Sequence, residues 1–387
     1  MHLLSLIWTA ILLALPIMAT TVYAEPDANS SEKQRVYIGT YTNNGSEGIY
    51  LCELDQKTGA LTLIGLAGKA NNPSFLARTP DNRFLYAVSE VEDYADTGGG
   101  AVAAFSIDPE GGQLTPLNHQ PSGGRGPCHV SLDRQSKNVL VANYGSGSAS
   151  VVPIADDGTL KDPSATVQHD GSSVNPDRQQ GAHAHSINVS PNNRFAFVAD
   201  LGLDKILVYK LDASAGTLTP SDPPHAKVAP GAGPRHFAFH PSGKFAYVIN
   251  ELTSTVTAFA YDADRGALAE LQTITTLPED FTGNNTTAEV RVHPSGKYLY
   301  GSNRGHDSIA MFSIDPATGK LTALGQHPSG GKTPRNFGID PSGGYLLAAH
   351  QDSNTVVVHR IDPAMGRLAA TNHKVEIPTP VCVEFAP

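Results

Sequence analysis

A segment in the second half of the chain brings basic and acidic side chains within reach of one another. Residues 231–251 read GAGPRHFAFHPSGKFAYVINE. Two apolar stretches flank a turn-forming Pro-Ser-Gly-Lys sequence, so the segment predicts a β-hairpin. Antiparallel pairing lays the start of the first strand beside the end of the second. Arg235 and His236 are therefore expected near Asn250 and Glu251, and a basic pair meets a carboxylate at one rim of the sheet.

Two histidines supply further titratable side chains. His183 and His185 stand two residues apart, and in a regular strand that spacing places both on one face. The spacing suits a metal ion, but the sequence offers no convincing third ligand, so neither a metal nor a cofactor is predicted. A histidine exchanges a proton near neutral pH, and Glu251 could do the same if its pKa were raised. A structural, hydrogen-bonding role is the alternative for either histidine.

Three arginines add positive charge to the same predicted region. Arg235, Arg304 and Arg335 come from successive copies of a repeat and are all expected at one mouth of the fold. They favour a ligand with a carboxylate or phosphate group, with surface or hydrogen-bonding duty as the alternative for each. Polar strand ends also have a plain structural explanation, because Asn, Asp and Ser are common there. The other polar strand-end residues expected at this mouth are Ser89, Glu90, Asn143, Tyr144, Asp200, Asn250, Asn303, His350 and Gln351.

One phrase recurs along the chain: an acidic residue, a short linker, a glycine and, two positions later, a leucine. It occurs seven times at intervals of 46 to 58 residues. A second phrase, a polar turn such as residues 241–243, joins two apolar stretches within most of these periods. Such a period, holding about four short strands, is typical of a β-propeller blade, and no window shows the 3.6-residue period of a helical solenoid. The glycines of the first phrase are Gly59, Gly112, Gly158, Gly216, Gly266, Gly319 and Gly366.

The fold predicted from this repeat is all-β, a seven-bladed β-propeller of four-stranded antiparallel blades. The second phrase lacks a seventh copy. The reason is that the two strands of the seventh period lie at opposite ends of the domain. Residues 380–385 look like a first strand without its partner, and residues 35–41 look like a second strand. Pairing of these segments would complete the last blade and close the ring, which removes exposed sheet edges. Loops into each innermost strand and out of each second strand would then share the mouth of the central channel.

The composition agrees with one large folded domain. The chain has 387 residues, of which 40% are hydrophobic and 17% are charged, so a sizeable core can form. The net charge of −10 argues against nucleic acid or an anionic membrane surface as a partner. Cys52, Cys128 and Cys382 are widely spaced and odd in number, which indicates buried thiols rather than a disulfide framework or a zinc site, with one disulfide in an oxidising compartment as the alternative. Neither a G-x-S-x-G motif nor a Walker-type glycine loop occurs.

The first 24 residues are predicted to be a signal peptide rather than part of the fold. Residues 3–18 form an apolar run, and residues 22–24 supply small side chains before a cleavage point. Residues 25–34 then form an N-terminal extension, and residues 35–387 form the propeller. This organisation predicts a periplasmic or secreted protein that has no membrane attachment after cleavage. An uncleaved anchor is the alternative, because the positively charged start of a signal peptide is missing.

Several of these segments together resemble one family. They are the hairpin GAGPRHFAFHPSGKFAYVINEL, the segment HSINVSPNNR after His183-Ala184, the strand end at Asn303-Arg304 and the segment TPRNFGIDPSGGYLLAAHQ, and they are similar to the seven-bladed lactonase propellers. That family includes bacterial 6-phosphogluconolactonase and the fungal enzyme that cyclises carboxymuconate. The resemblance implies a carboxylic-ester hydrolase that opens a sugar-derived lactone. The catalytic residues that it implies are His185, Arg235, Glu251 and Arg304. The substrate-binding residues expected at the mouth are His183, His236, Asn143, Asn250, Arg335 and Gln351.

The implied reaction starts when His185 or Glu251 removes a proton from water. The hydroxide attacks the lactone carbonyl while Arg235 stabilises the developing oxyanion, and Arg304 and Arg335 hold an acidic substituent. The expected partner is thus a small, acidic lactone. The predicted export signal is a difference from 6-phosphogluconolactonase, which serves a cytoplasmic pathway. An exported protein would meet unphosphorylated aldonolactones or other cyclic esters.

Two other functions fit the same fold. A cycloisomerase of the carboxymuconate-lactonising type would use the same base in the opposite direction and consume no water. A non-enzymatic propeller would bind a ligand or a partner, because propellers host many functions. Convergence of His185, Arg235 and Glu251 on one ligand-sized space favours an enzyme, whereas dispersed side chains paired to the backbone favour a binding protein.

Overall fold

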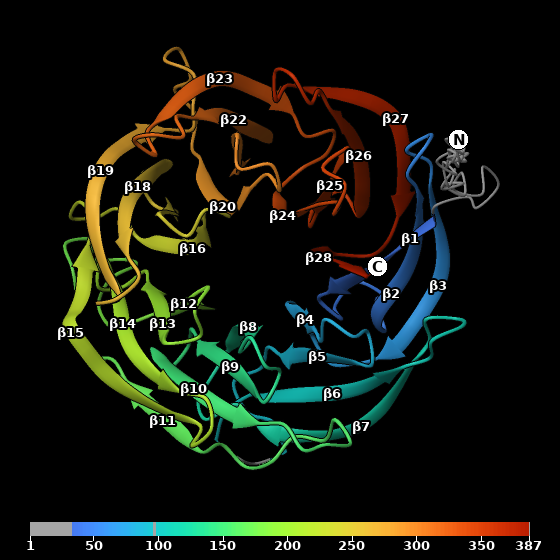
Figure 1. Ribbon diagram of the computed structural model, residues 1–387. Coiled ribbons are helices and arrows are strands. Elements are labelled where there is room, and N and C mark those ends of the chain that lie inside the picture. Colours follow the sequence, from blue (N-terminus) through green and yellow to red (C-terminus); the bar gives the residue numbers. More distant parts are fainter. Residues whose placement is uncertain (1–32, 96–97, 387) are drawn as a thin grey trace, which may run out of the picture. The chain divides into compact units, whose positions relative to one another are not determined.

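The computed structural model describes residues 33–95 and 98–386, so the predicted signal peptide and nearly all of the predicted extension lie outside the described residues. Within those two ranges every regular element is a β-strand. The strands form seven sheets of four antiparallel strands, arranged as blades around a common centre (Figure 1). The predicted all-β, seven-bladed propeller is therefore confirmed. No helix in the described ranges is long and apolar enough to cross a membrane.

The strands follow one another as successive blades, and only one blade combines both ends of the domain. The first half of the ring contains β1 (Lys33–Thr40), β2 (Gly48–Asp55), β3 (Leu61–Lys69), β4 (Leu76–Arg78), β5 (Phe84–Ser89), β6 (Ala101–Ile107), β7 (Leu114–Pro121), β8 (Pro127–Leu132), β9 (Asn138–Asn143), β10 (Ser148–Pro153), β11 (Ala165–Gln168), β12 (Ala184–Val189), β13 (Phe195–Asp200) and β14 (Lys205–Asp212). The second half contains β15 (Thr217–Lys227), β16 (Pro234–Phe239), β17 (Phe245–Asn250), β18 (Thr255–Asp262), β19 (Ala267–Thr275), β20 (Thr286–Val292), β21 (Tyr298–Arg304), β22 (Ser308–Ile314), β23 (Leu321–Pro328), β24 (Pro334–Ile339), β25 (Tyr345–His350), β26 (Thr355–Ile361), β27 (Leu368–Glu376) and β28 (Pro380–Ala386).

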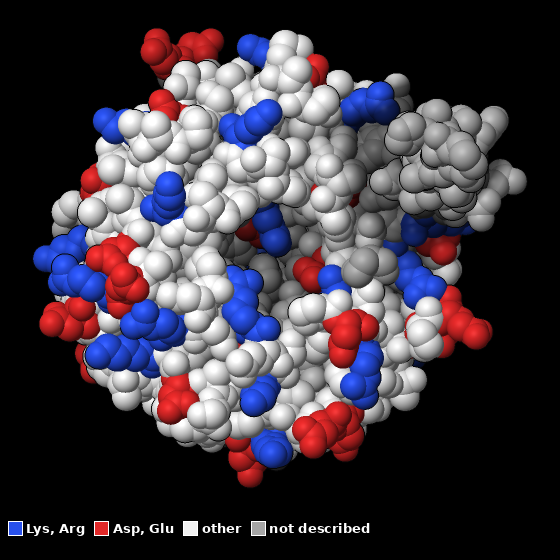
Figure 2. All heavy atoms as spheres, viewed as in Figure 1, with Lys and Arg blue, Asp and Glu red and all other residues white. Residues whose placement is uncertain are grey.

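Each blade has one strand nearest the centre of the ring. These innermost strands are β4, β8, β12, β16, β20, β24 and β28, and each contacts the innermost strand of both neighbours. The second strands behind them are almost continuous apolar runs. For example, all six residues of β17 are buried, because both faces of a blade pack against other blades. Figure 2 shows one face of the ring, hollowed at its centre, with Lys and Arg side chains at the edge of the hollow.

The ring closes as the sequence predicts. β28 pairs antiparallel with β1, so that Phe385 lies opposite Val36 and Val383 lies opposite Ile38. One blade is therefore formed by β28, β1, β2 and β3. This pairing gives β1 a neighbour on each side, and it places the end of the domain within the ring rather than at an exposed edge.

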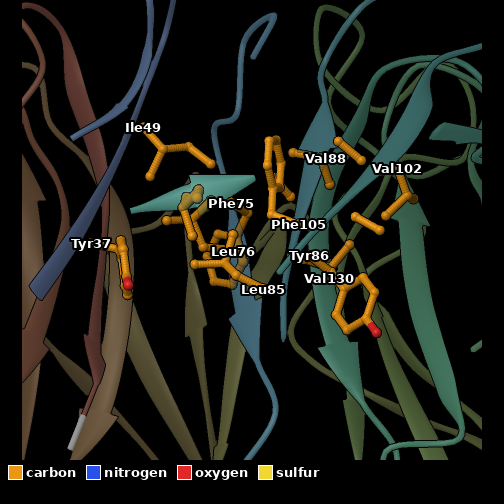
Figure 3. Packing of buried hydrophobic residues seen from close by; sticks show 14 of the residues in the cluster. Tyr37, Ile49, Phe75, Leu76, Leu85, Tyr86, Val88, Val102, Phe105 and Val130 are labelled. Atoms are coloured by element: carbon orange, nitrogen blue, oxygen red, sulfur yellow. The ribbon is translucent and has the colours of Figure 1, made fainter. Parts of the chain in front are cut away.

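Hydrophobic cores lie between blades. One cluster joins Tyr37 of β1, Tyr86 of β5 and Val130 of β8, with Phe75 packed among them (Figure 3). Removal of each such side chain from water contributes about 1.5–3 kcal/mol, so the interfaces between blades fix the positions of the innermost strands. The three cysteines are buried and form no disulfide, as predicted; they are Cys52, Cys128 and Cys382.

Candidate active site

A β-bulge at the start of β16 takes Arg235 out of the regular ladder. Pro234 pairs with Asn250 and His236 pairs with Ile249, so Arg235 has no partner on β17. A bulge leaves the extra residue unpaired and re-aims its side chain. The same irregularity recurs at the start of three other innermost strands. There it leaves Cys128, His185 and Arg335 unpaired.

The four bulged residues meet at one small space inside the ring. Its volume is about 10 Å³, which is room for about one water molecule. Antiparallel pairing sets the end of each second strand beside the start of the innermost strand. Residues that follow second strands, such as Glu90, Tyr144 and Glu251, therefore lie next to the bulged residues. The space is lined by Ser74, Phe75, Glu90, Cys128, His185, Arg235, His236, Arg335 and Val381.

Glu251 is held by three guanidinium groups. Its Oε2 atom lies 3.0 Å from Nε of Arg235 and 3.1 Å from Nη2 of Arg304, and its Oε1 atom accepts a hydrogen bond of 2.8 Å from Arg178. Glu251 as a whole is 5% exposed. Burial alone would raise the pKa of Glu251, but Arg304, Arg235 and Arg178 outweigh it and lower the pKa to about 2. The condition under which Glu251 would exchange protons near neutral pH, a raised pKa, is therefore not met.

His185 lies between Glu251 and Cys128. Its Nε2 atom is 3.9 Å from Oε2 of Glu251, and its Nδ1 atom is 3.6 Å from Sγ of Cys128. Burial is the main cause that lowers the pKa of His185 well below 6.5, and Arg235 adds to the effect. The imidazole is therefore neutral at physiological pH, in contact with the small space that Arg235 also lines.

The two other predicted arginines take different partners. Arg304 donates a hydrogen bond to the carbonyl of Thr287 at 2.8 Å besides its contact with Glu251. Burial lowers the pKa of Arg304 to about 9, although Glu251 acts in the opposite direction. Arg335 donates to the Tyr41 hydroxyl at 2.9 Å, and its guanidinium carbon lies 5.4 Å from the centre of that ring. Arg304 thus belongs to the Glu251 group, and Arg335 lies on another wall of the space.

The predicted histidines other than His185 have structural contacts. His183 stacks on Tyr144 with ring centres 4.5 Å apart, and its Nδ1 atom lies 3.0 Å from the Tyr144 carbonyl oxygen. The bulge at His185 breaks the alternation assumed for the pair, so His183 and His185 meet Tyr144 in different ways, stacked and edge-on. His236 bonds through both ring nitrogens, at 3.1 Å to Glu289 and at 3.3 Å to Arg235. It therefore contacts Arg235 and lines the small space beside it.

Three predicted substrate-binding residues do not line the small space. The side-chain nitrogen of Asn143 donates to the Ser148 hydroxyl at 3.2 Å, within its own blade. Asn250 donates to the hydroxyl of Thr255 at 2.9 Å, also inside its blade. Gln351 does not line the small space. A position at the end of a strand therefore brings a residue to the mouth, but the side chain can still turn into the blade.

Two contributors to the site carry no assignment from the sequence. Arg178 lies in the loop between β11 and β12, and besides Glu251 it reaches the Tyr144 hydroxyl at 3.3 Å. No repeat position predicts that contact, because this loop, residues 169–183, is longer than the loops that join the other blades. Tyr41 directly follows β1, as Glu90 follows β5. Tyr41 would be found from the sequence if the closing blade were aligned with the other repeats, because it then takes the position of Glu90.

A larger cavity occupies the later part of the innermost strands. Its volume is about 540 Å³, and its lining includes Arg78, Arg291 and Glu384. Neither Arg235 nor Glu251 lines this cavity. The predicted catalytic residues therefore lie at the smaller space, although the other cavity is larger. Among residues 33–95 and 98–386, no group of three His, Cys, Asp or Glu side chains is placed to hold a metal ion.

Known proteins match this chain over almost the whole propeller. Residues 35–385 match the family described as "Lactonase, 7-bladed beta-propeller". The 6-phosphogluconolactonase of Bacillus subtilis is 43% identical over 285 residues, which cover 74% of this chain and 79% of that protein. The 6-phosphogluconolactonase of Formosa agariphila is 36% identical over 300 residues, which cover 76% and 82%. The solved structure of the periplasmic gluconolactonase of Pseudomonas aeruginosa matches with a TM-score of 0.86 at 32% identity, over 92% of this chain and 99% of that one. The chain therefore belongs to the seven-bladed β-propeller lactonase family.

Proposed function

We propose that this chain hydrolyses a sugar-derived lactone to the open-chain aldonic acid. The observation that carries the proposal is that Arg235 and His185 lie 3.0 and 3.9 Å from Glu251 and both line one small space. Catalytic side chains that meet at one site favour an enzyme over a binding propeller. The names of the relatives, 6-phosphogluconolactonase and gluconolactonase, support a lactone as the substrate class.

Arg235 is suited to stabilise the oxyanion of ester hydrolysis. Attack on a lactone carbonyl builds negative charge on its oxygen, and donors held in place beforehand stabilise that charge most effectively. Arg235 is 2% exposed. Its Nη1 atom donates to the Ala288 carbonyl at 2.7 Å, and its Nε atom lies beside Glu251. The guanidinium is thus fixed before the substrate arrives.

Glu251 and His185, the two side chains expected to activate water, differ in how well each can act as a base. The pKa of Glu251 is lowered to about 2, after burial and three arginines have acted in opposite directions. Glu251 therefore serves to position the arginines. His185 is neutral, but burial and Arg235 lower its pKa well below 6.5, which makes it a weak base. We assign His185 the role of hydrogen-bond partner to the attacking water.

The charge at the mouth favours an acidic lactone. Four guanidinium groups, those of Arg178, Arg235, Arg304 and Arg335, lie with the carboxylates of Glu251 and Glu90. The excess of positive charge in a chain with a net charge of −10 suits a carboxylate or phosphate on the substrate, or the acid product. A panel of neutral, carboxylate-bearing and phosphorylated lactones separates these options.

Export to the periplasm completes the proposal. The apolar run of residues 3–18 supports it, as does the likeness to a gluconolactonase described as periplasmic. Export would bring the protein into contact with unphosphorylated lactones. Recovery of a chain that starts at Glu25 from the periplasmic fraction would support this location, and recovery of the uncleaved chain from the cytoplasm would contradict it.

The test is lactone hydrolysis by Arg235→Ala, followed as proton release at constant pH across the lactone panel. Loss of an oxyanion donor is expected to lower kcat/KM by about 100- to 1,000-fold. Arg83→Ala is the matched control, because Arg83 is exposed and contacts the Phe84 ring instead. Thermal unfolding of both variants checks that they fold. Unchanged activity in folded Arg235→Ala would overturn the assignment.

A further inference from the structure

Glu90 lines the small space together with Arg235 and His185, whereas Glu251 does not line it. The backbone of Glu90 is clamped to a neighbouring loop. Its amide donates to the Asn72 carbonyl at 3.1 Å, and the Asn72 side chain donates to the Glu90 carbonyl at 3.2 Å. The position of Glu90 at the mouth is therefore fixed independently of any ligand.

The partners of Glu90 are neutral hydroxyl groups. Both of its carboxylate oxygens lie 3.0 Å from the Tyr41 hydroxyl, and Ser74 donates a hydrogen bond to Oε2. Among residues 33–95 and 98–386, no ion pair includes Glu90. Hydroxyl partners stabilise a carboxylate far less than guanidinium partners do. Within these ranges Glu90 therefore lacks the guanidinium contacts that hold Glu251.

The hydroxyl of Tyr41 also orients Glu90. Arg335 donates to this hydroxyl at 2.9 Å, so the proton of Tyr41 is directed to Glu90. A carboxylate has about four acceptor positions, and the two hydroxyl donors leave at least one of them open. A water molecule there would have Glu90, His185 and Arg235 around it.

We propose that Glu90 is the general base that activates the hydrolytic water, an inference that rests on the proposed lactone hydrolysis. Glu90 takes a proton from water as the water oxygen bonds to the lactone carbonyl carbon. Arg235 stabilises the oxyanion. When the tetrahedral intermediate collapses, the bond between the carbonyl carbon and the ring oxygen breaks, and the proton held by Glu90 passes to that oxygen. The product is a hydroxy acid, and Glu90 is again a carboxylate.

The test combines two substitutions with chemical rescue. Glu90→Gln and Glu90→Ala are each expected to lower kcat about 100-fold or more, with KM changed only a few-fold, because general-base catalysis supplies a factor of that size. Added formate should restore kcat of Glu90→Ala at least 10-fold, since a small carboxylate can occupy the vacated volume. It should not restore Glu90→Gln, whose side chain fills that volume. A residue with a merely structural role would show no rescue.

Glu270→Gln is the matched control, because Glu270 also accepts from a hydroxyl, that of Thr273 at 3.1 Å, but on an outer strand. Wild-type kcat in Glu90→Gln, or a folded Glu90→Ala that formate does not rescue, would overturn the role of Glu90 and leave the lactonase function standing. Wild-type protein without activity on any lactone would overturn both.

Discussion

The charge of Glu251 is balanced by three arginines, and that balance makes the folded state sensitive to acid. Burial raises and Arg304, Arg235 and Arg178 lower the pKa of Glu251, with the net result of about 2 against an ordinary 4.5. A carboxylate whose pKa is lower in the folded state stabilises the fold above pH 4.5, and this contribution disappears as the pH falls toward 2. The shift corresponds to a stabilisation on the order of 3 kcal/mol.

We predict that Glu251→Gln lowers the free energy of unfolding at pH 6 by about 3–5 kcal/mol, because three buried cations lose their counter-charge. Between pH 5 and pH 3 the variant should lose less stability than wild type does. Urea unfolding across this range measures both effects. Asp264→Asn is the control, since the side chain of Asp264 is 96% exposed. A variant with the same pH dependence as wild type would contradict the electrostatic role given to Glu251.

At the scale of single residues, simple strand pairing predicted part of the site. It placed Arg235 beside Glu251 correctly, because the ends of paired strands are neighbours whatever their side chains do. It did not predict the bulge that leaves Arg235 without a partner on β17, nor the contact of His236 with Glu289. It placed Asn250 at the mouth as a substrate-binding residue but did not predict that its side chain bonds to a threonine of the adjacent strand. Side-chain direction at a strand end depends on such irregularities and on neighbouring strands, which one sequence does not display.

The elements are joined by the glycine of the repeated phrase. Gly319 has φ of +72°, and a β-carbon there would lie 2.3 Å from a ring carbon of Phe245 in the neighbouring blade. The carbonyl of the same glycine accepts a hydrogen bond of 3.0 Å from Tyr247. Gly266 meets Phe195 and Gly366 meets Tyr298 in the same manner. The repeat therefore marks a contact between blades as well as a turn within one.

We predict that Gly319→Ala destabilises the protein by about 2–4 kcal/mol, through backbone strain and the clash with Phe245. Gly243→Ala is the matched control. Gly243 has φ of +67°, but its β-carbon would meet nothing within 4 Å, so only the backbone cost of about 1 kcal/mol is expected. Urea unfolding compares the two variants with wild type. Equal losses would contradict the role of the glycine in contacts between blades.

At the scale of the whole molecule, the sequence predicted the architecture well because each blade repeats the same alternation of strands and turns. It even predicted the closing blade, since residues 380–385 lacked a partner within their own period. Packing between blades was not predictable from the same pattern. The cluster that joins Tyr37, Tyr86 and Val130 depends on blades that are neighbours in space. The shape of the site follows from that packing.

Closure of the ring by β28 should decide whether the domain folds. Val381, Val383 and Phe385 are at most 9% exposed. Loss of their burial would cost about 1.5–3 kcal/mol for each side chain. The sum is a large part of the free energy of unfolding of a typical domain, which is about 5–15 kcal/mol. Removal of residues 380–387 is expected to abolish cooperative urea unfolding. A permuted chain should fold and keep lactonase activity if it starts at Asp280, joins Ala386 to Lys33 through a short linker and ends at Glu279. Arg35 pairs with Ala386, so a hairpin-length linker suffices. A truncated chain with the wild-type urea midpoint would contradict closure as a source of stability.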